Sequence, residues 1–219
     1  HIDAIRVSTI LNRYTLTGDI IYPLVIDSKY TVDIDTLPDW VKYEALVYSG
    51  LEMVSPGKAR RPMPDSVKMV VTDFDGVITD GRVWVNGDGV ETVAASRSDS
   101  MRIRQMRAAG IEVMILSSEV DNVVSARARK MGIQAIHGMG LDGKGEVLKN
   151  ILAEKNLNAA EVVYLGNDFN DLPCFDVAGW AVAVADAYPE VLRAADYVLK
   201  TNGGFGALRE LCDLILKNK

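Results

Sequence analysis

Short apolar runs alternate with longer amphipathic stretches along the chain from about residue 65 onward. The apolar runs have the length of buried strands, and the stretches between them have the spacing of helices. The predicted strands are 67–72, 111–116, 133–136, 162–165, 181–184 and 197–199. The predicted helices are 99–109, 120–131, 145–155, 170–177, 189–194 and 207–217. This alternation predicts an α/β fold with a doubly wound, mostly parallel sheet covered by helices on both faces.

Two stretches depart from that alternation. Residues 83–91 consist of strand-like runs around Asn86-Gly87, which is a hairpin signal. The Pro-rich, basic stretch 56–64 has no apolar periodicity and is predicted to be a linker. We therefore divide the chain into a short N-terminal segment, 1–55, the linker, 56–64, and an α/β domain, 65–219. The N-terminal segment contains strand-like runs at 20–26 and 30–34 and an amphipathic stretch at 40–47.

The composition narrows the classes of function. A net charge of −6 over 219 residues makes a nucleic-acid partner unexpected. The histidines are His1 and His137, so carboxylates or lysine are expected to carry out acid–base chemistry. The two cysteines, Cys174 and Cys212, are too few for a disulfide framework, so we expect a cytoplasmic protein. No signal peptide is evident and no apolar run reaches membrane-spanning length, so we expect no membrane partner.

The segments after the predicted strands carry the side chains suited to catalysis. Ligands of a parallel sheet bind beyond the carboxyl ends of its strands. Asp73-Phe74-Asp75-Gly76-Val77 follows the first strand, and Gly76 permits a sharp turn there. Ser117-Ser118 ends the second strand, Lys144 lies beyond the third, and the run Gly166–Asp171 ends the fourth. Hard oxygen ligands suit Mg²⁺ and lysine suits a phosphate, which indicates magnesium-assisted phosphate chemistry.

These motifs, in this order, resemble those of the haloacid dehalogenase superfamily. They are Asp73-x-Asp75-Gly76-Val77, Ser117, Lys144 and Gly166-Asn167-Asp168-x-Asn170-Asp171. The ordered set is far more specific than any one member, and the resemblance covers about residues 65 to 219. It implies a Rossmann-like phosphatase domain in which Asp73 is the nucleophile and forms an aspartyl-phosphate. Asp75 would then be the general acid and base.

The resemblance also implies roles for the remaining motif residues. Ser117 and Lys144 would hold the phosphoryl oxygens. Mg²⁺ would be held by Asp73, the backbone carbonyl of Asp75 and the side chain of Asn167, where most superfamily members have Asp. Asp168 and Asp171 would contact the metal ligands without binding the metal themselves. The residues expected to line the substrate are Gly76, Ser118, Glu119 and Arg97.

The spacing of the motifs limits the size of any cap over the site. Asp73 and Ser117 are 44 residues apart, and Ser117 and Lys144 are 27 apart, so neither gap admits a cap domain. Capless superfamily members resemble tetramers in which a neighbouring subunit covers the site. The run Gly203–Glu210 looks like the tail of the capless sugar-acid phosphatases. We therefore expect a homotetramer in which Gly203–Leu208 reaches a neighbour's pocket.

The substrate class follows from the same resemblance. Those phosphatases act on 3-deoxy-octulosonate 8-phosphate or on nonulosonate (sialic acid-like) 9-phosphates. Glu119 looks more like the nonulosonate branch, since the octulosonate enzymes tend to have Arg there. The N-terminal runs His1–Arg6 and Tyr30–Trp40 resemble the C-terminal end of acylneuraminate cytidylyltransferases, some of which carry such a phosphatase domain behind them. We therefore expect a fragment of a bifunctional protein that cannot transfer CMP alone.

Several alternatives stay open at the level of sequence. Ser117 could be a helix N-cap, with Ser118 binding the phosphate instead. Lys144 could be a solvated lysine, and Arg97 a plain surface charge. The substrate could be the octulosonate 8-phosphate. The substitution of Asn167 for the usual Asp also allows a non-catalytic module that oligomerises a cytidylyltransferase.

Overall fold

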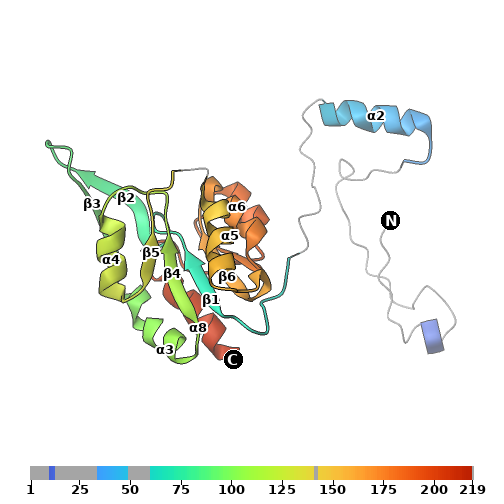
Figure 1. The fold of residues 1–219 in the computed structure, drawn as a ribbon. Helices are drawn as coiled ribbons and strands as arrows, with labels where there is room; N and C mark the ends of the chain where they lie inside the picture. The colour runs from blue at the N-terminus through green and yellow to red at the C-terminus, as the bar shows by residue number, and fades with distance from the viewer. Residues whose placement is uncertain (1–9, 13–33, 49–59, 141–142, 219) are drawn as a thin grey trace. The chain divides into compact units, whose positions relative to one another are not determined.

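The computed structural model describes residues 10–12, 34–48, 60–140 and 143–218. The chain forms two compact units, His1–Pro56 and Gly57–Lys219. In the first unit, helix α2 (Leu37–Tyr48) contains the predicted amphipathic stretch (Figure 1). Thr36 and Asp39 cap it reciprocally, since each backbone N–H donates to the other's side chain. The predicted strand 20–26 lies outside the described residues, as does all of 30–34 except its last residue.

The second unit is a parallel α/β domain. Its strands are β1 (Met69–Thr72), β2 (Thr79–Val85), β3 (Glu91–Ala95), β4 (Glu112–Leu116), β5 (Gln134–Ile136), β6 (Val162–Gly166), β7 (Trp180–Ala183) and β8 (Tyr197–Val198). Its α-helices are α3 (Ile103–Ala108), α4 (Val123–Met131), α5 (Lys144–Glu154), α6 (Leu172–Val177), α7 (Pro189–Ala194) and α8 (Ala207–Lys217). Three 3₁₀ helices, η2 (Ser98–Met101), η3 (Ala159–Glu161) and η4 (Phe169–Asp171), complete the described part of this unit.

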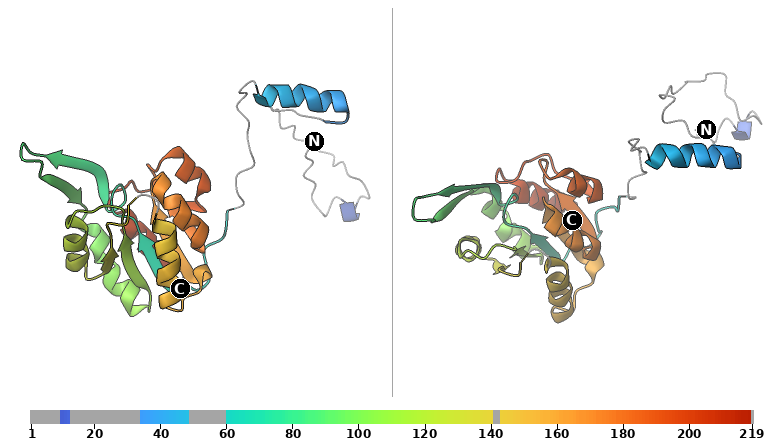
Figure 2. Two further views of the ribbon diagram at one scale, coloured as in Figure 1. Left: turned by 45° about the horizontal axis from the view of Figure 1, so that its top comes forward. Right: turned by 90° about the horizontal axis from the view of Figure 1, so that it is seen from above.

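The main sheet has the strand order β5-β4-β1-β6-β7-β8, and all of its pairings are parallel. The chain moves outward from β1 to β5, crosses back to β6 and moves outward again to β8. Right-handed crossovers place the helices of these two directions on opposite faces (Figure 2). Helices α5, α6 and α7 pack in one row, and α3 packs on α8. The predicted doubly wound fold is therefore confirmed, with strand ends within two residues of those predicted.

The core lies along the central strands. Every residue of β1, β6 and β7 is buried, because helices cover both faces of the sheet. Burying each Val or Leu side chain contributes roughly 1.5–3 kcal/mol. Among the described residues, none of the helices combines the length and the hydrophobicity that a bilayer crossing requires.

Strands β2 and β3 form a separate two-stranded ribbon that projects from the body of the domain (Figure 1). It confirms the hairpin predicted around Asn86, whose side-chain oxygen accepts the backbone N–H groups of Asp88 and Val90. Its apolar side chains Val83, Trp84 and Val85 are about half exposed, at 48%, 58% and 59%. The hairpin thus presents apolar surface outside the core of this subunit.

The predicted linker ends earlier than residue 64. Arg61 is anchored to the domain by two hydrogen bonds to the carboxylate of Asp196, at 2.9 and 2.8 Å. Its guanidinium also donates to the carbonyls of Ala178 and Phe175, and Trp180 donates to its backbone carbonyl. The chain from Arg61 onward is therefore attached to the domain, because Arg61 pairs with the buried carboxylate of Asp196.

The glycine-rich tail packs on its own domain, and the expected contact of Gly203–Leu208 with a neighbour's pocket stays a prediction. Gly204 donates its N–H to the carbonyl of Val77 at 2.9 Å, and Ala207 and Leu208 are buried in the core. Asp99, fully buried, accepts the N–H of Arg209 in the first turn of α8. Burial raises the pKa of Asp99 to about 6. In this segment Phe205 alone is a large exposed side chain, at 66%.

Candidate active site

The carboxyl ends of β1 and β6 lie side by side and place Asp73 at the centre of the sheet edge. Thr72 pairs with Leu165, and Asp73 donates its N–H to the carbonyl of Leu165 at 2.9 Å. Asp73 is only 5% exposed. One of its oxygens, Oδ1, accepts the backbone N–H of Phe74 at 2.7 Å and contacts Nζ of Lys144 at 2.8 Å. The side chain is therefore held in one orientation.

Lys144 links two carboxylates inside the domain. Its ammonium group, which is completely buried, lies 2.8 Å from Oδ1 of Asp73 and 2.8 Å from Oδ1 of Asp171. Asp171 also accepts the hydroxyl of Tyr164 and the backbone N–H groups of Asn167 and Asp168. Because four donors hold Asp171, its charge positions Lys144 and the loop after β6. The interpretation of Lys144 as a solvated lysine is wrong.

The charges of this cluster shift its pKa values in a consistent pattern. Burial, followed by repulsion from Asp171, raises the pKa of Asp73 to about 7, although Lys144 opposes the shift. Burial lowers the pKa of Lys144, but the two carboxylates outweigh it and the net shift is upward. Lys144 therefore stays protonated, and its single positive charge is shared between the carboxylates of Asp73 and Asp171. Burial also raises the pKa of Asp75, which favours a protonated carboxyl group.

Asn167 lies against the loop that carries Asp73. Its Oδ1 is buried and has no hydrogen-bond partner, although its backbone N–H donates to Asp171. A side chain at Gly76 would overlap the Asn167 amide group, so the two loops touch. Gly76 has a φ of +74°, which glycine adopts without strain. Asp168 caps η4 instead, where its Oδ1 accepts the N–H of Phe169.

The end of β4 contributes hydroxyl groups. Ser117 is buried, and its Oγ accepts the N–H of Glu119 at 3.1 Å, so it also caps the following turn. Ser118 accepts a hydrogen bond from the amide of Asn170 at 3.2 Å. The other amide atom of Asn170, Oδ1, is buried without a partner. Both serines therefore stay candidates for phosphate binding, and Ser118 is coupled to the loop after β6.

A pocket of about 230 Å³ opens beside Asp75. The residues that line it are Asp75, Gly81, Val83, Glu91, Val93, Glu119, Asp121 and Val123. Its polar lining is entirely acidic, and it lies between the hairpin and the turn after β4. Arg97 does not line this pocket; it is exposed at the start of η2. Of the residues predicted to line a substrate, Glu119 lies in this pocket and Arg97 does not.

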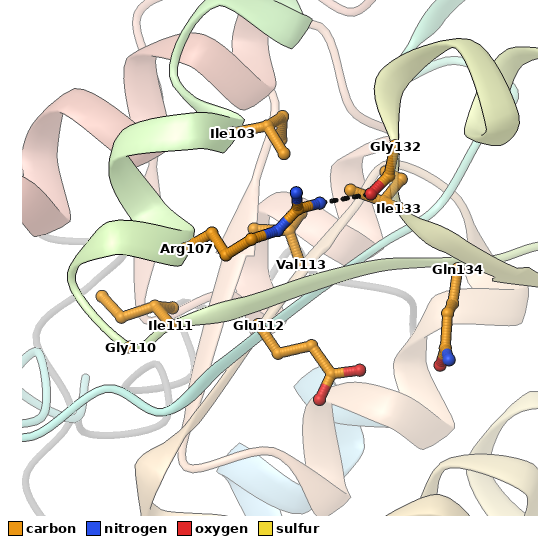
Figure 3. Close-up of a pocket in the computed structure, with 9 residues that line it drawn as sticks. All are labelled: Ile103, Arg107, Gly110, Ile111, Glu112, Val113, Gly132, Ile133 and Gln134. Carbon is orange, nitrogen blue, oxygen red and sulfur yellow. Dashed lines mark hydrogen bonds between the residues drawn. The ribbon is translucent and has the colours of Figure 1, made fainter.

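A larger hollow, of about 360 Å³, lies at the opposite edge of the sheet. It is formed where β4 and β5 begin, and Arg107 crosses it to donate to the carbonyl of Gly132 (Figure 3). Ile103, Ile111 and Val113 supply apolar walls. The carboxylates, lysine and serines described above lie at the carboxyl ends of the strands, so this hollow is separate from them.

Sequence patterns missed two residues of the site. Tyr164 lies within the apolar run of β6, where nothing distinguishes its buried hydroxyl from a packing residue. Asn170 was part of the recognised motif, yet no role was expected for it. Local periodicity gives no signal for Asn170, because it lies in η4 whereas Asn167 precedes the extended N-cap residue Asp168.

Comparison with known proteins identifies relatives of the domain. The family model of haloacid dehalogenase-like hydrolases matches residues 140–211. The 3-deoxy-D-manno-octulosonate 8-phosphate phosphatase KdsC of Escherichia coli is 34% identical over 152 residues, which cover 69% of this chain and 80% of that protein. A crystal structure of the corresponding phosphatase of Moraxella catarrhalis, in complex with magnesium, phosphate and KDO, has 30% identity and a TM-score of 0.66. The match covers 70% of this chain and 87% of that one.

A longer relative matches more of the chain. The N-acylneuraminate cytidylyltransferase of Oncorhynchus mykiss is 33% identical over 200 residues, or 87% of this chain. That share exceeds the part of the chain in residues 65–219, so the similarity continues into the N-terminal segment. The match covers 44% of the cytidylyltransferase, so this chain corresponds to less than half of that protein's length.

Proposed function

The chain belongs to the haloacid dehalogenase-like hydrolase family and is a phosphatase related to KdsC, and we propose that it hydrolyses a sugar-acid phosphate through an aspartyl-phosphate on Asp73. The contact between Lys144 and Asp73 carries this proposal. A buried ammonium group 2.8 Å from a nearly buried carboxylate keeps that carboxylate oriented where a phosphoryl group would bind. The same ammonium group would then contact the transferred phosphoryl oxygens.

The reaction uses the residues at this edge in two steps. Asp73 attacks phosphorus, and the bond from phosphorus to the sugar oxygen breaks as Asp75 gives that oxygen its proton. Water then attacks the aspartyl-phosphate while Asp75 accepts a proton from it, which releases phosphate and restores Asp73. The raised pKa of Asp75 suits a group that begins as an acid. Lys144 and Ser117 hold the phosphoryl oxygens throughout.

The cofactor of this phosphatase is Mg²⁺, which the crystal structure of the Moraxella catarrhalis relative contains. We assign it to Asp73, the carbonyl of Asp75 and Oδ1 of Asn167. The partnerless oxygen of Asn167 fits this assignment, since a buried oxygen without a donor is the kind of atom that a cation satisfies. The described residues contain no group of three or more carboxylate, histidine or cysteine side chains suited to a metal, so the site would rely on a backbone carbonyl and an amide, with water or substrate oxygens as further ligands. When bound, Mg²⁺ supplies positive charge that offsets the negative charges of Asp73 and phosphate.

Replacing Asn167 with aspartate is expected to tighten Mg²⁺ binding by about tenfold, because a carboxylate binds a hard cation more strongly than an amide does. The added buried charge should also lower the stability of the metal-free protein. Calorimetric titration of Mg²⁺ into both forms measures the affinity.

Asn170→Asp is the matched control, because Asn170 is also an amide with a partnerless Oδ1 in the same loop. We expect its Mg²⁺ affinity to change less than that of Asn167→Asp. If Asn170→Asp tightens binding and Asn167→Asp does not, the ligand is Asn170.

For the substrate we propose a nonulosonate 9-phosphate of the sialic acid type. Phosphate lies at one end of such a molecule and the carboxylate at the other, with hydroxyl groups between them. The acidic pocket beside Asp75 would accept hydrogen bonds from those hydroxyls and repel the carboxylate, which orients the substrate. Two observations support a nine-carbon substrate: the presence of Glu119 in that pocket and the similarity to N-acylneuraminate cytidylyltransferase. The similarity to KdsC supports the octulosonate 8-phosphate as the second candidate.

Phosphate release from both sugar acids and from an aryl phosphate, with Mg²⁺ present, tests the proposal. We expect kcat/KM to be about tenfold or more higher for N-acylneuraminate 9-phosphate than for 3-deoxy-octulosonate 8-phosphate, a difference of at least about 1.4 kcal/mol. In Glu119→Gln the preference should shrink. An equal or reversed preference would reject the nine-carbon substrate, and no release from any compound would reject catalysis.

Assembly and cellular context complete the proposal. We propose a homotetramer, because the half-exposed Val83, Trp84 and Val85 of the hairpin are apolar surface that another subunit could cover. Light scattering of the same preparation should give four times the mass of one chain.

A cytoplasmic location is proposed because Cys174 and Cys212 are free thiols. Residues 1–55 are proposed to belong to a cytidylyltransferase domain of the type found in the longer relative.

A further inference from the structure

The tail loop touches the outside of the nucleophile loop. A methyl group at Gly203 would overlap the backbone carbonyl of Gly76, so no side chain fits between the two glycines. Two hydrogen bonds hold the tail there. Gly203 donates to Oδ1 of Asp186 at 2.9 Å, and Gly204 donates to the carbonyl of Val77 at 2.9 Å. The tail is thus fixed both to the loop after β7 and to the nucleophile loop.

Gly76 also contacts Asn167. A methyl group at Gly76 would overlap the Asn167 amide group, so Gly76 contacts both Gly203 and Asn167. The backbone of Gly76 directly follows Asp75, whose carbonyl we assign to the metal. Any outward or inward shift of this peptide therefore changes the separation between Asn167 and the Asp73–Asp75 loop.

We propose that Gly203 is a positioning residue that sets the geometry of the Mg²⁺ site by holding Gly76 against Asn167. This inference rests on the metal ligands of the proposed function. Its physical basis is that Mg²⁺ demands near-ideal octahedral geometry at about 2.0–2.1 Å, so a shift of a few tenths of an ångström in one ligand weakens binding. The Gly203 backbone is not in the left-handed region, so replacing it acts through this contact and not through backbone strain.

The test is calorimetric titration of Mg²⁺ into Gly203→Ala in the absence of substrate. The added methyl group would displace the Gly76 peptide, which is expected to weaken Mg²⁺ binding by about tenfold or more, the range found when groups supporting metal ligands are altered. Asp186→Ala removes the acceptor of Gly203, and because Asp186 is exposed, this variant is expected to fold. It should weaken Mg²⁺ in the same direction by a smaller factor.

Gly179→Ala is the matched control for stability. Its methyl group would meet the Ala160 backbone at 2.6 Å, which is also a backbone clash, though a milder one than that between Gly203 and the Gly76 carbonyl, and it lies just before β7 and away from the site. We expect it to lower the melting temperature and to leave the Mg²⁺ affinity unchanged. Wild-type Mg²⁺ affinity in Asp186→Ala, together with wild-type affinity in Gly203→Ala if that variant folds, would overturn the proposal.

A separate variant distinguishes this inference from the ligand assignment. If Asn167→Ala binds Mg²⁺ as the wild type does, the ligand assignment fails. If Asn167→Ala weakens Mg²⁺ while Gly203→Ala and Asp186→Ala do not, the ligand assignment holds and the positioning role of Gly203 fails.

Discussion

Asp73→Asn is expected to lower kcat by at least about 10⁴-fold, the scale on which the loss of a nucleophile acts in enzymes with covalent intermediates. The amide has no lone pair nucleophilic enough to attack phosphorus, so no aspartyl-phosphate forms. Its shape is nearly the same, and its Oδ1 can still accept hydrogen bonds from Phe74 and Lys144. The variant should therefore fold. Phosphate release under saturating Mg²⁺ measures the loss.

The same variant has a second signature in stability. The pKa of Asp73 is raised to about 7 by burial and by Asp171, so the folded metal-free chain holds a proton that the unfolded chain loses above about pH 4. The stability of the metal-free wild type should consequently fall as the pH rises toward 7. Asp73→Asn removes that contribution, so its urea midpoint should change less between pH 5 and pH 7.5.

A folded variant that keeps more than about 1% of wild-type turnover would reject Asp73 as the nucleophile.

The sheet was predictable because its strands are buried on both faces. Such strands are continuous apolar runs, and those of β1, β6 and β7 are unambiguous in the sequence. The location of the site was predictable from these strands, because Asp73, Ser117 and Asn167 lie at the carboxyl ends of the adjacent strands β1, β4 and β6. Their roles as nucleophile, phosphate ligand and metal ligand are still predictions.

Contacts between distant segments were not predictable from local patterns. The tail glycines gave a recognisable motif, but glycine carries no side chain that indicates its partner, and its packing on Gly76 is set by the fold. Arg61 looked like part of a basic linker because its partner, Asp196, lies 135 residues away. Helix α4 begins three residues later than predicted. The side chains of Glu119 and Asp121 accept the backbone N–H groups of Asp121 and Val123, which holds the preceding residues in a turn.

Lys144→Met is expected to have the largest effect on stability. It would leave Asp73 and Asp171 buried and facing each other without the ammonium group that lies 2.8 Å from each. Removing one partner of a buried ion pair costs about 3–5 kcal/mol. Catalysis should also fall by at least about 10²–10³-fold, because a positive group that stabilises the transferring phosphoryl oxygens is gone. Urea unfolding and phosphate release measure the two effects separately.

The pH dependence identifies electrostatics as the cause of that loss. Without Lys144 the pKa of Asp73 should rise further, because the lysine now opposes the upward shift. A proton can then replace the missing cation at low pH, so the variant should be closer to the wild type in stability at pH 5.5 than at pH 8. Lys149→Met is the control, since Lys149 is on the same helix but is 57% exposed and should change stability by less than about 0.5 kcal/mol. If Lys144→Met matches Lys149→Met in stability at pH 8, then Lys144 does not neutralise the two buried carboxylates.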